Sequence, residues 1–188
     1  MTTVGFALTG SFCTFARAVA QMKNLVDLGY NVLPIMSYVA YGTDTRFGSA
    51  EEFRNRIVEI TGHEIIHTIT AAEPIGPKSM LDILAVVPAT GNTIAKIANG
   101  INDTPVTMAA KAHLRNSKPL LIAVSTNDAL SSSAQNIGRL LNVKNIYFVP
   151  MKQDDIKRKP ASIVADFEMV APAVKAALEG KQLEPVYI

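Results

Sequence analysis

Short runs of consecutive apolar residues recur along the chain, and most are followed by a segment in which apolar residues return every three or four positions. Runs that are apolar along their whole length are typical of parallel strands covered on both faces. Six runs therefore predict buried strands: Val4–Gly10, Asn31–Ser37, Glu64–Thr70, Leu81–Pro88, Pro119–Thr126 and Asn145–Pro150.

The intervening segments have helical spacing. Gly29 ends the first of them, and the segment that starts at Ser49 has Glu52 in the capping-box position and Gly62 at its end. Helices are predicted over about Cys13–Leu28, Ser49–Gly62, from Asn92 onward, Thr104–Arg115, Ser131–Asn142 and Ser162–Gly180. This alternation predicts one α/β domain over residues 1–188, with a doubly wound, Rossmann-like parallel sheet of about six strands.

Two segments have no regular pattern. Tyr38–Phe53 is left unplaced, and Met151–Ser162 is a charged loop. We interpret the charged loop as solvated surface or as a functional lid.

Composition and charge narrow the classes of protein. With 48% hydrophobic and 18% charged residues, the chain has the composition of a folded protein with a substantial core. The net charge is only +2 and the basic residues are scattered, so a nucleic-acid partner is not expected.

A single cysteine, Cys13, suits a reducing compartment. The first residues lack the features of a signal peptide, and no apolar run reaches the ~20 residues of a membrane span. We therefore expect a cytoplasmic protein.

Small polar residues follow four of the predicted strands. Because ligands of open parallel sheets lie beyond the carboxyl ends of the strands, these residues are candidates for a binding site. Each Ser, Thr or Asn could simply cap a helix. Four such turns together favour a phosphate-bearing ligand, which helix N-termini bind well. The candidates are Thr9, Gly10, Ser11, Phe12, Ser37, Ala89, Thr90, Gly91, Asn92, Thr93, Ser125, Thr126, Asn127 and Asp128.

Motifs that are missing restrict the ligand. The first turn has no GxGxxG pattern, and the second strand ends in "IMS" and not in an acidic residue. There is also no GxxxxGK[ST] loop. A mononucleotide with a terminal phosphate therefore fits better than a dinucleotide or a nucleoside triphosphate.

The segment "PATGNTIAKIANGIND", Pro88–Asp103, together with "TGS" in the first turn, resembles the signature of a flavoprotein family. That family includes phosphopantothenoylcysteine decarboxylase, the peptidyl-cysteine decarboxylases and the flavin prenyltransferases. The resemblance implies an FMN cofactor held at the interfaces of a homotrimer, which can assemble further into a dodecamer. It implies no metal. The cofactor positions that we carry over are Gly10, Ser11, Phe12, Ser37, Ala89, Thr90, Asn92, Thr93, Ser125, Thr126 and Asn127.

The chain departs from the decarboxylases of this family at two places. Where they have a P-x-M-N clamp, this chain reads "STND" and keeps only Asn127. Their catalytic histidine corresponds to Pro74, and none of the three histidines, His63, His67 and His113, occupies that position. Decarboxylation by the family route is therefore not expected, and no catalytic residue is assigned.

The stretches "AEPIGPKSMLD" and "TPVTMAAKAHLRNSKPLLIAVSTND" are similar to a branch of the family found in spore-forming bacteria. Members of this branch form one component of a two-component oxidoreductase. The resemblance implies oxidation of a dihydropyridine dicarboxylate to an aromatic diacid during sporulation, in the mother cell. It also implies a partner component that binds NADP, which leaves the flavin either redox-active or vestigial. A decarboxylase, a prenyltransferase-like enzyme and a non-catalytic scaffold are the alternatives.

A dicarboxylate substrate requires cationic side chains. Arginine favours bidentate binding of a carboxylate, and Arg46 follows the second predicted strand. Lys78 is the second predicted substrate residue, and Lys111 and Arg115 are further candidates. Lys96 and Asp103 are expected to hold two helices together.

Overall fold

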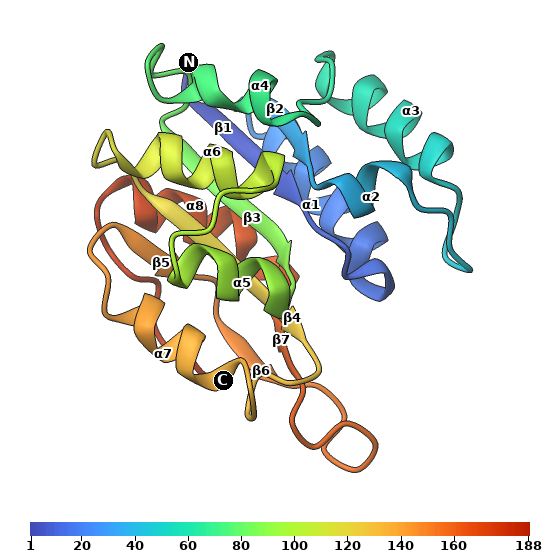
Figure 1. The fold of residues 1–188 in the computed structure, drawn as a ribbon, viewed down its shortest axis with the longest axis vertical. Helices are drawn as coiled ribbons and strands as arrows, with labels where there is room; N and C mark the ends of the chain where they lie inside the picture. The colour runs from blue at the N-terminus through green and yellow to red at the C-terminus, as the bar shows by residue number, and fades with distance from the viewer.

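The computed structural model describes residues 1–188 as a mixed sheet with helices on both faces (Figure 1). The strands are β1 (Thr3–Leu8), β2 (Asn31–Met36), β3 (Ile83–Ala89), β4 (Leu120–Thr126), β5 (Ile146–Phe148), β6 (Met151–Gln153) and β7 (Ile163–Ala165). The α-helices are α1 (Phe15–Asp27), α2 (Tyr38–Gly42), α3 (Ala50–Thr61), α4 (Ile69–Ala72), α5 (Gly91–Ala98), α6 (Pro105–Leu114), α7 (Ala134–Leu141) and α8 (Val170–Leu178). Three short 3₁₀ helices are η1 (Phe12–Thr14), η2 (Glu73–Ile75) and η3 (Phe167–Met169).

Five strands are parallel, in the order β2-β1-β3-β4-β5. This is the strand order of flavodoxin-like doubly wound sheets. The sheet divides at β4, because the first residues of β4 pair with β5 and its last residues pair with β7. Ser125 and Thr126 pair with Val164 and Ile163 in antiparallel register, and β7 pairs in turn with β6. The predicted fold class is confirmed, while the prediction of about six parallel strands is corrected to five with an antiparallel pair.

The third predicted strand, Glu64–Thr70, is wrong. Ile66 makes one isolated parallel bridge with Ile35, and the chain then enters α4. The Thr68 side chain accepts a hydrogen bond from the Ala71 backbone and caps this helix, which ends the extended stretch. Glu64–Thr70 therefore forms no strand. It contributes one bridge beside β2, at the edge of the sheet, and then the start of α4.

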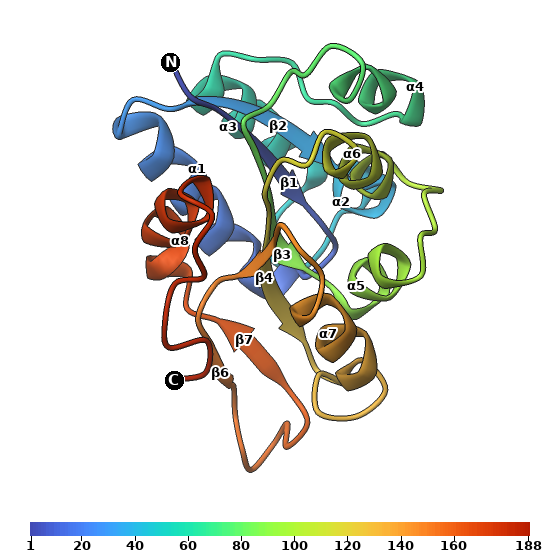
Figure 2. The same ribbon diagram turned by 90° about the vertical axis from the view of Figure 1, so that its left-hand side faces the viewer.

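The sequence predicts a terminal helix from Ser162, but α8 begins at Val170. Ile163–Ala165 forms β7 instead, and the Asp166 side chain caps η3. The predicted charged loop forms β6 and a long connection to β7, which we call the arm (residues 154–162). The arm projects from the body of the molecule (Figures 1 and 2).

Two apolar clusters fill the two sides of the sheet. One cluster packs β-strand side chains against α1, α3 and α8, and the other packs them against α4, α5, α6 and α7. Figure 2 shows the sheet between these two layers of helices. None of the helices combines the length and apolar character that crossing a membrane would require.

The unplaced segment Tyr38–Phe53 contains α2 and the start of α3. The predicted capping box is present, since Ser49 Oγ accepts from Glu52 N at 3.1 Å and Glu52 Oε2 accepts from Ser49 N at 3.1 Å. Gly62 ends α3 with a φ of 68°, the left-handed conformation that favours glycine.

Candidate cofactor and substrate site

The turns after β1, β2, β3 and β4 meet at the carboxyl edge of the sheet. Hydrogen bonds lock the first turn to the third. Thr9 Oγ1 donates to the Pro88 carbonyl at 2.7 Å and accepts from Thr90 N at 3.1 Å. Thr9 is buried, and the two hydrogen bonds of its hydroxyl set the spacing of the two turns.

Three hydroxyl groups join the first turn to the end of β4. Ser11 Oγ lies 2.8 Å from Ser125 Oγ, and Thr14 Oγ1 lies 3.2 Å from each of them. Each hydroxyl can donate or accept, so the group can reorient its protons toward a ligand. The result is a polar wall shared by two segments that are more than a hundred residues apart in sequence.

The turn after β4 is organised by the Asp128 carboxylate. Oδ1 accepts from Thr126 Oγ1 at 2.6 Å and from Ser133 Oγ at 2.9 Å, and Oδ2 accepts from Ser132 Oγ at 2.6 Å. These hydrogen bonds, from Ser132 first, hold the pKa of Asp128 below its ordinary value despite partial burial. Asp128 is therefore ionised at neutral pH and holds its turn in shape.

Gly91, the first residue of α5, packs directly against this turn. A Cβ on Gly91 would lie 2.6 Å from Ser133 Oγ, 2.8 Å from Thr126 Oγ1 and 2.9 Å from Asp128 Oδ1. These are closer than real Cβ contacts, so glycine permits the approach of α5 to the β4 turn. Thr90 caps the helix, with its Oγ1 accepting from Thr93 N at 3.3 Å.

Three adjoining hollows, all lined in part by Gly10, lie over these turns. The first, of about 500 Å³, lies between the β1, β2 and β3 turns and reaches the ion pair of Lys96 and Asp103. The second, of about 540 Å³, has no apolar residue and lies over the β1, β3 and β4 turns. The third, of about 470 Å³, lies between η1, the loop before α3 and the arm. We call them the β2 hollow, the central hollow and the arm hollow.

All predicted cofactor residues except Ala89 line one or more of these hollows. Ala89 is fully buried at the end of β3. Of the two predicted substrate residues, Arg46 lines the arm hollow. Lys78 is exposed in the loop before β3, at the opposite edge of the sheet, and lines none of the three.

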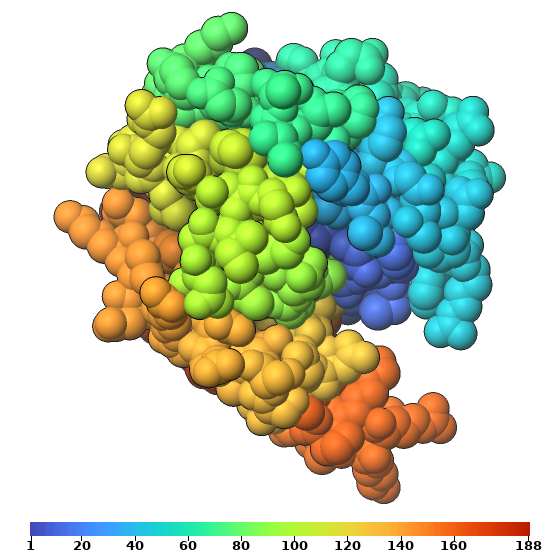
Figure 3. All heavy atoms as spheres, viewed as in Figure 1, coloured from blue at the N-terminus to red at the C-terminus, as the bar shows by residue number.

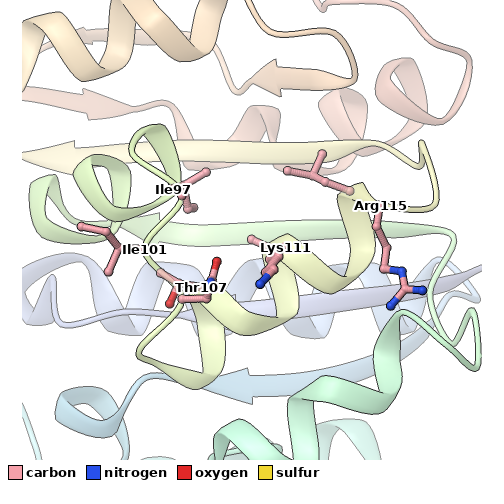
Figure 4. Close-up of a pocket in the computed structure, with 9 residues that line it drawn as sticks. Ile97, Ile101, Thr107, Lys111 and Arg115 are labelled. Atoms are coloured by element: carbon pink, nitrogen blue, oxygen red, sulfur yellow. The ribbon is translucent and has the colours of Figure 1, made fainter.

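Lys111 and Arg115 lie elsewhere. They line a separate groove of about 430 Å³ between α5 and α6, whose apolar side chains include Ile97 and Ile101 (Figure 4). Lys96 and Asp103 form the expected ion pair, with Lys96 Nζ 2.7 Å from Asp103 Oδ1. This pair lowers the pKa of Asp103.

The three histidines lie outside the hollows. His113 is buried, with Nε2 2.9 Å from the Pro119 carbonyl, and burial lowers its pKa to about 4. His63 bonds Asn31, and His67 stacks on Tyr41 with ring centroids 3.9 Å apart. None of the three histidines therefore contributes a side chain to the hollows.

Sequence reasoning missed several lining residues. Arg17, Asp154 and Lys159 line the arm hollow, and Tyr38 and Val39 line the β2 hollow. Arg17 lies in the first turn of α1, directly after η1, and this closeness to the first strand's turn is a signal that the sequence contains. Asp154 and Lys159 cannot be placed from the sequence, because their segment has no regular pattern that would give its direction.

The residues present suit a phosphate-bearing mononucleotide. Gly91 and Asn92, the first two residues of α5, line the central hollow, and backbone N–H groups at a helix start have no intrahelical partner, whereas Thr93 N already donates to Thr90 Oγ1. Each hollow lies within the roughly 300–1,000 Å³ typical of small-molecule sites. Asn92 and Ser37 add amide and hydroxyl groups to the β2 hollow.

The fold and this site define a flavoprotein. A model of the flavoprotein family matches residues 1–175, and the chain belongs to that family. Individual proteins of the family resemble this chain over nearly its whole length. The B subunit of dipicolinate synthase from Bacillus subtilis (strain 168) is 43% identical over 185 residues, which cover 98% of this chain and 92% of the relative.

Solved structures agree with this placement. The crystal structure of the dipicolinate synthase B subunit from Bacillus halodurans C is 46% identical, has a TM-score of 0.92, and aligns with 100% of this chain and 96% of that chain. The FMN-dependent cysteine decarboxylase SpaF has a TM-score of 0.68 at 22% identity, covering 95% of this chain and 96% of that one. That second likeness concerns the fold alone.

Proposed function

We propose that this chain binds FMN over the carboxyl ends of β1–β4 and acts as the B subunit of a dipicolinate synthase. The observation that carries the FMN proposal is the central hollow, where the turns after β1, β3 and β4 meet the start of α5 at Gly91 and Asn92. The similarity to two relatives of that name, each above 40% identity over nearly the whole chain, supports the reaction.

The reaction proposed is oxidation of dihydrodipicolinate to dipicolinate, in the cytoplasm of the mother cell of a sporulating bacterium. The A subunit of dipicolinate synthase is the partner in this proposal, and it binds NADP. When bound, FMN supplies an N5 that can take a hydride from a dihydropyridine ring stacked on it. Ser11, Thr14 and Ser125 orient the ligand from the shared polar wall, and Asn92 with Ser37 holds polar groups of the cofactor.

Assembly is part of the proposal. We propose a homo-oligomer, a trimer or a dodecamer, that binds the partner. A related fold is described as a dodecameric FMN-dependent decarboxylase from Escherichia coli O157:H7, with a TM-score of 0.66 at 21% identity. Size-exclusion chromatography with light scattering measures the state directly, and a monomer at micromolar concentration would contradict it.

The first experiment asks whether FMN is bound and used. The purified chain should be yellow, and dihydrodipicolinate should bleach the flavin absorbance in the absence of the partner. Dipicolinate formation is then measured for this chain and the partner separately and together. Asn92→Asp places a negative charge in the β2 and central hollows and should lower FMN affinity at least tenfold, while Asn142→Asp, at the end of α7, should not.

The outcomes separate the candidate functions. If Asn92→Asp abolishes flavin binding and the mixture with the partner keeps full activity, the flavin is not part of the reaction and the chain is a scaffold. If the chain binds FMN and instead releases CO₂ from a cysteine substrate, the oxidoreductase proposal fails in favour of a decarboxylase.

A further inference from the structure

The arm hollow collects charged side chains from three separate segments. Arg17 comes from α1, Arg46 from the loop between α2 and α3, and Asp154 and Lys159 from the arm. In Figure 3 a blue segment near the beginning of the chain lies beside the cyan segment that precedes α3, and the orange arm lies below both. None of these segments neighbours another in sequence, so the cluster exists only in the folded chain.

Each of the two arginines stacks on an aromatic ring, and neither is neutralised by an acidic partner. Arg17 Cζ lies 4.7 Å from the centroid of the Phe167 ring, and Arg46 Cζ lies 4.9 Å from that of Phe47. Neither guanidinium makes a salt bridge or a hydrogen bond to the protein, whereas Arg139 donates to Asn99 Oδ1 at 3.2 Å. Stacking on a ring orients a guanidinium and leaves its edge donors free for a planar anion.

Lys159 has a partner within the arm. Its Nζ lies 2.7 Å from Asp154 Oδ2, so these two charges compensate each other. The hollow is therefore left with the two positive charges of Arg17 and Arg46. That excess matches a ligand with two carboxylates, because each arginine can bind one carboxylate in bidentate fashion.

The position and remaining lining of the hollow also suit a flat ring. Phe12 and Phe47 provide apolar faces, and Ser11, Ser125 and Asn127 are shared with the central hollow. A ring bound here would lie beside the polar strand ends to which FMN is assigned. A planar diacid could thus contact both arginines and the shared hydroxyl wall.

We propose that Arg17 and Arg46 form the carboxylate-binding subsite of this protein, each arginine binding one carboxylate of a planar ring dicarboxylate in the arm hollow. The inference rests on the proposed function, and it adds Arg17 and the arm as determinants of substrate specificity. Lys159 and Asp154 act as a positioning pair that keeps the arm charge-neutral beside the subsite.

Binding of the product dipicolinate to the FMN-loaded chain, measured by isothermal titration calorimetry without the partner, tests this directly. Pyridine-2-carboxylate, with a single carboxylate, is the comparison ligand. The wild-type chain should prefer the diacid at least tenfold. Arg17→Gln and Arg46→Gln should each weaken dipicolinate binding about 10- to 100-fold, which corresponds to the charge-assisted hydrogen bonds removed. The double variant should not distinguish the two ligands.

Arg56→Gln is the matched control, because Arg56 is an exposed arginine of α3 outside the hollows. It should bind dipicolinate like the wild type. All variants should retain FMN, since neither Arg17 nor Arg46 lines the β2 or central hollow. A thermal unfolding midpoint within about 2 °C of the wild type checks that each variant is folded.

Two results would overturn the subsite. One is equal binding of the diacid and the monoacid by the wild type, and the other is unchanged dipicolinate affinity in Arg17→Gln and Arg46→Gln. Failure of the proposed function has a different signature. In that case the mixture of this chain with its partner would form no dipicolinate, whatever the calorimetry shows.

Discussion

At the scale of single residues, the site depends on side chains that shape turns more than on side chains that could react. Asp128 accepts three hydroxyl hydrogen bonds, and Thr9 ties two turns together. Outside the site, His113 also has a structural role, because its Nε2 lies 2.9 Å from the Pro119 carbonyl in the connection between α6 and β4. Substitutions at these residues should therefore act first on stability.

Asp128→Asn should lower the free energy of unfolding by about 1 kcal/mol at pH 7, because an amide cannot accept all three hydroxyl protons. The folded-state pKa of Asp128 lies below its ordinary value of 3.8, so its contribution is present above that value and is lost as pH falls further. Urea unfolding at pH 7 and pH 3 measures the difference, which should shrink at the lower pH. Asp27→Asn, in an exposed α1 ion pair, is the control.

His113 gives stability a second dependence on pH. Its pKa is lowered by burial from 6.5 to about 4 in the folded chain, so the unfolded chain binds the proton more readily. The stability that comes from neutral His113 is therefore full above pH 6.5 and falls as pH drops toward 4, by up to about 3 kcal/mol. His113→Gln, which can still donate to the Pro119 carbonyl, should remove this part of the slope in urea titrations between pH 7.5 and 4.5. An unchanged slope would contradict the assignment.

At the scale of elements, the start of α5 meets several structural requirements at once. Thr90 caps the helix, Gly91 allows close contact with the Asp128 turn, and Gly91 and Asn92 line the central hollow. Its helix also carries Ile94 and Ala98 into the core. The dense small polar residues of Pro88–Asp103 reflect these simultaneous requirements.

Gly91→Ala should destabilise the chain by about 1–3 kcal/mol, because its Cβ would overlap the Asp128 turn. The displaced turn should also lower FMN affinity at least tenfold in a fluorescence titration. Gly138→Ala in α7 is the matched control, since its Cβ would meet no atom within 4 Å. That variant should gain roughly 0.5–1 kcal/mol from helix propensity.

The capping box of α3 allows stability to be tested separately from binding, because neither Ser49 nor Glu52 lines a hollow. Ser49→Ala should cost about 1 kcal/mol of unfolding free energy by leaving Glu52 N without its acceptor. FMN and dipicolinate affinities should be unchanged. Loss of dipicolinate binding would show that the loop carrying Arg46 depends on this cap.

At the scale of the whole molecule, the sheet changes partner along β4. Its first half continues the parallel sheet into β5, and its last residues pair with β7, which carries the arm toward α1. This switch places the arm hollow beside the turns after β1 and β4. The site therefore draws on segments from residue 10 to residue 164.

Binding of FMN should stabilise the whole chain. A ligand that binds only the folded state adds RT ln(1 + [L]/Kd), about 2.7 kcal/mol at 100 times Kd. Thermal unfolding with FMN should show this increase, and riboflavin, which lacks the phosphate, should give a smaller one. Equal shifts would mean that the phosphate is not recognised by the turns at α5.

The sequence by itself determined the doubly wound class, most strands and helices, and the turns that line the central and β2 hollows. Those features come from local signals, namely continuous apolar runs, caps and glycines, and the carboxyl-edge rule of parallel sheets relates the turns to one another. The predictions for Ser49 and Gly62 succeeded for the same local reason.

Only the tertiary structure decided where β4 changes partner, that Glu64–Thr70 is not a strand, and that Arg17, Arg46 and the arm share one hollow. Lys78 and Lys111 carry the same charge as Arg46, yet the fold places them at other faces. Long-range pairing sets such positions, because contacts between distant segments depend on the packing of the whole sheet and not on neighbouring residues.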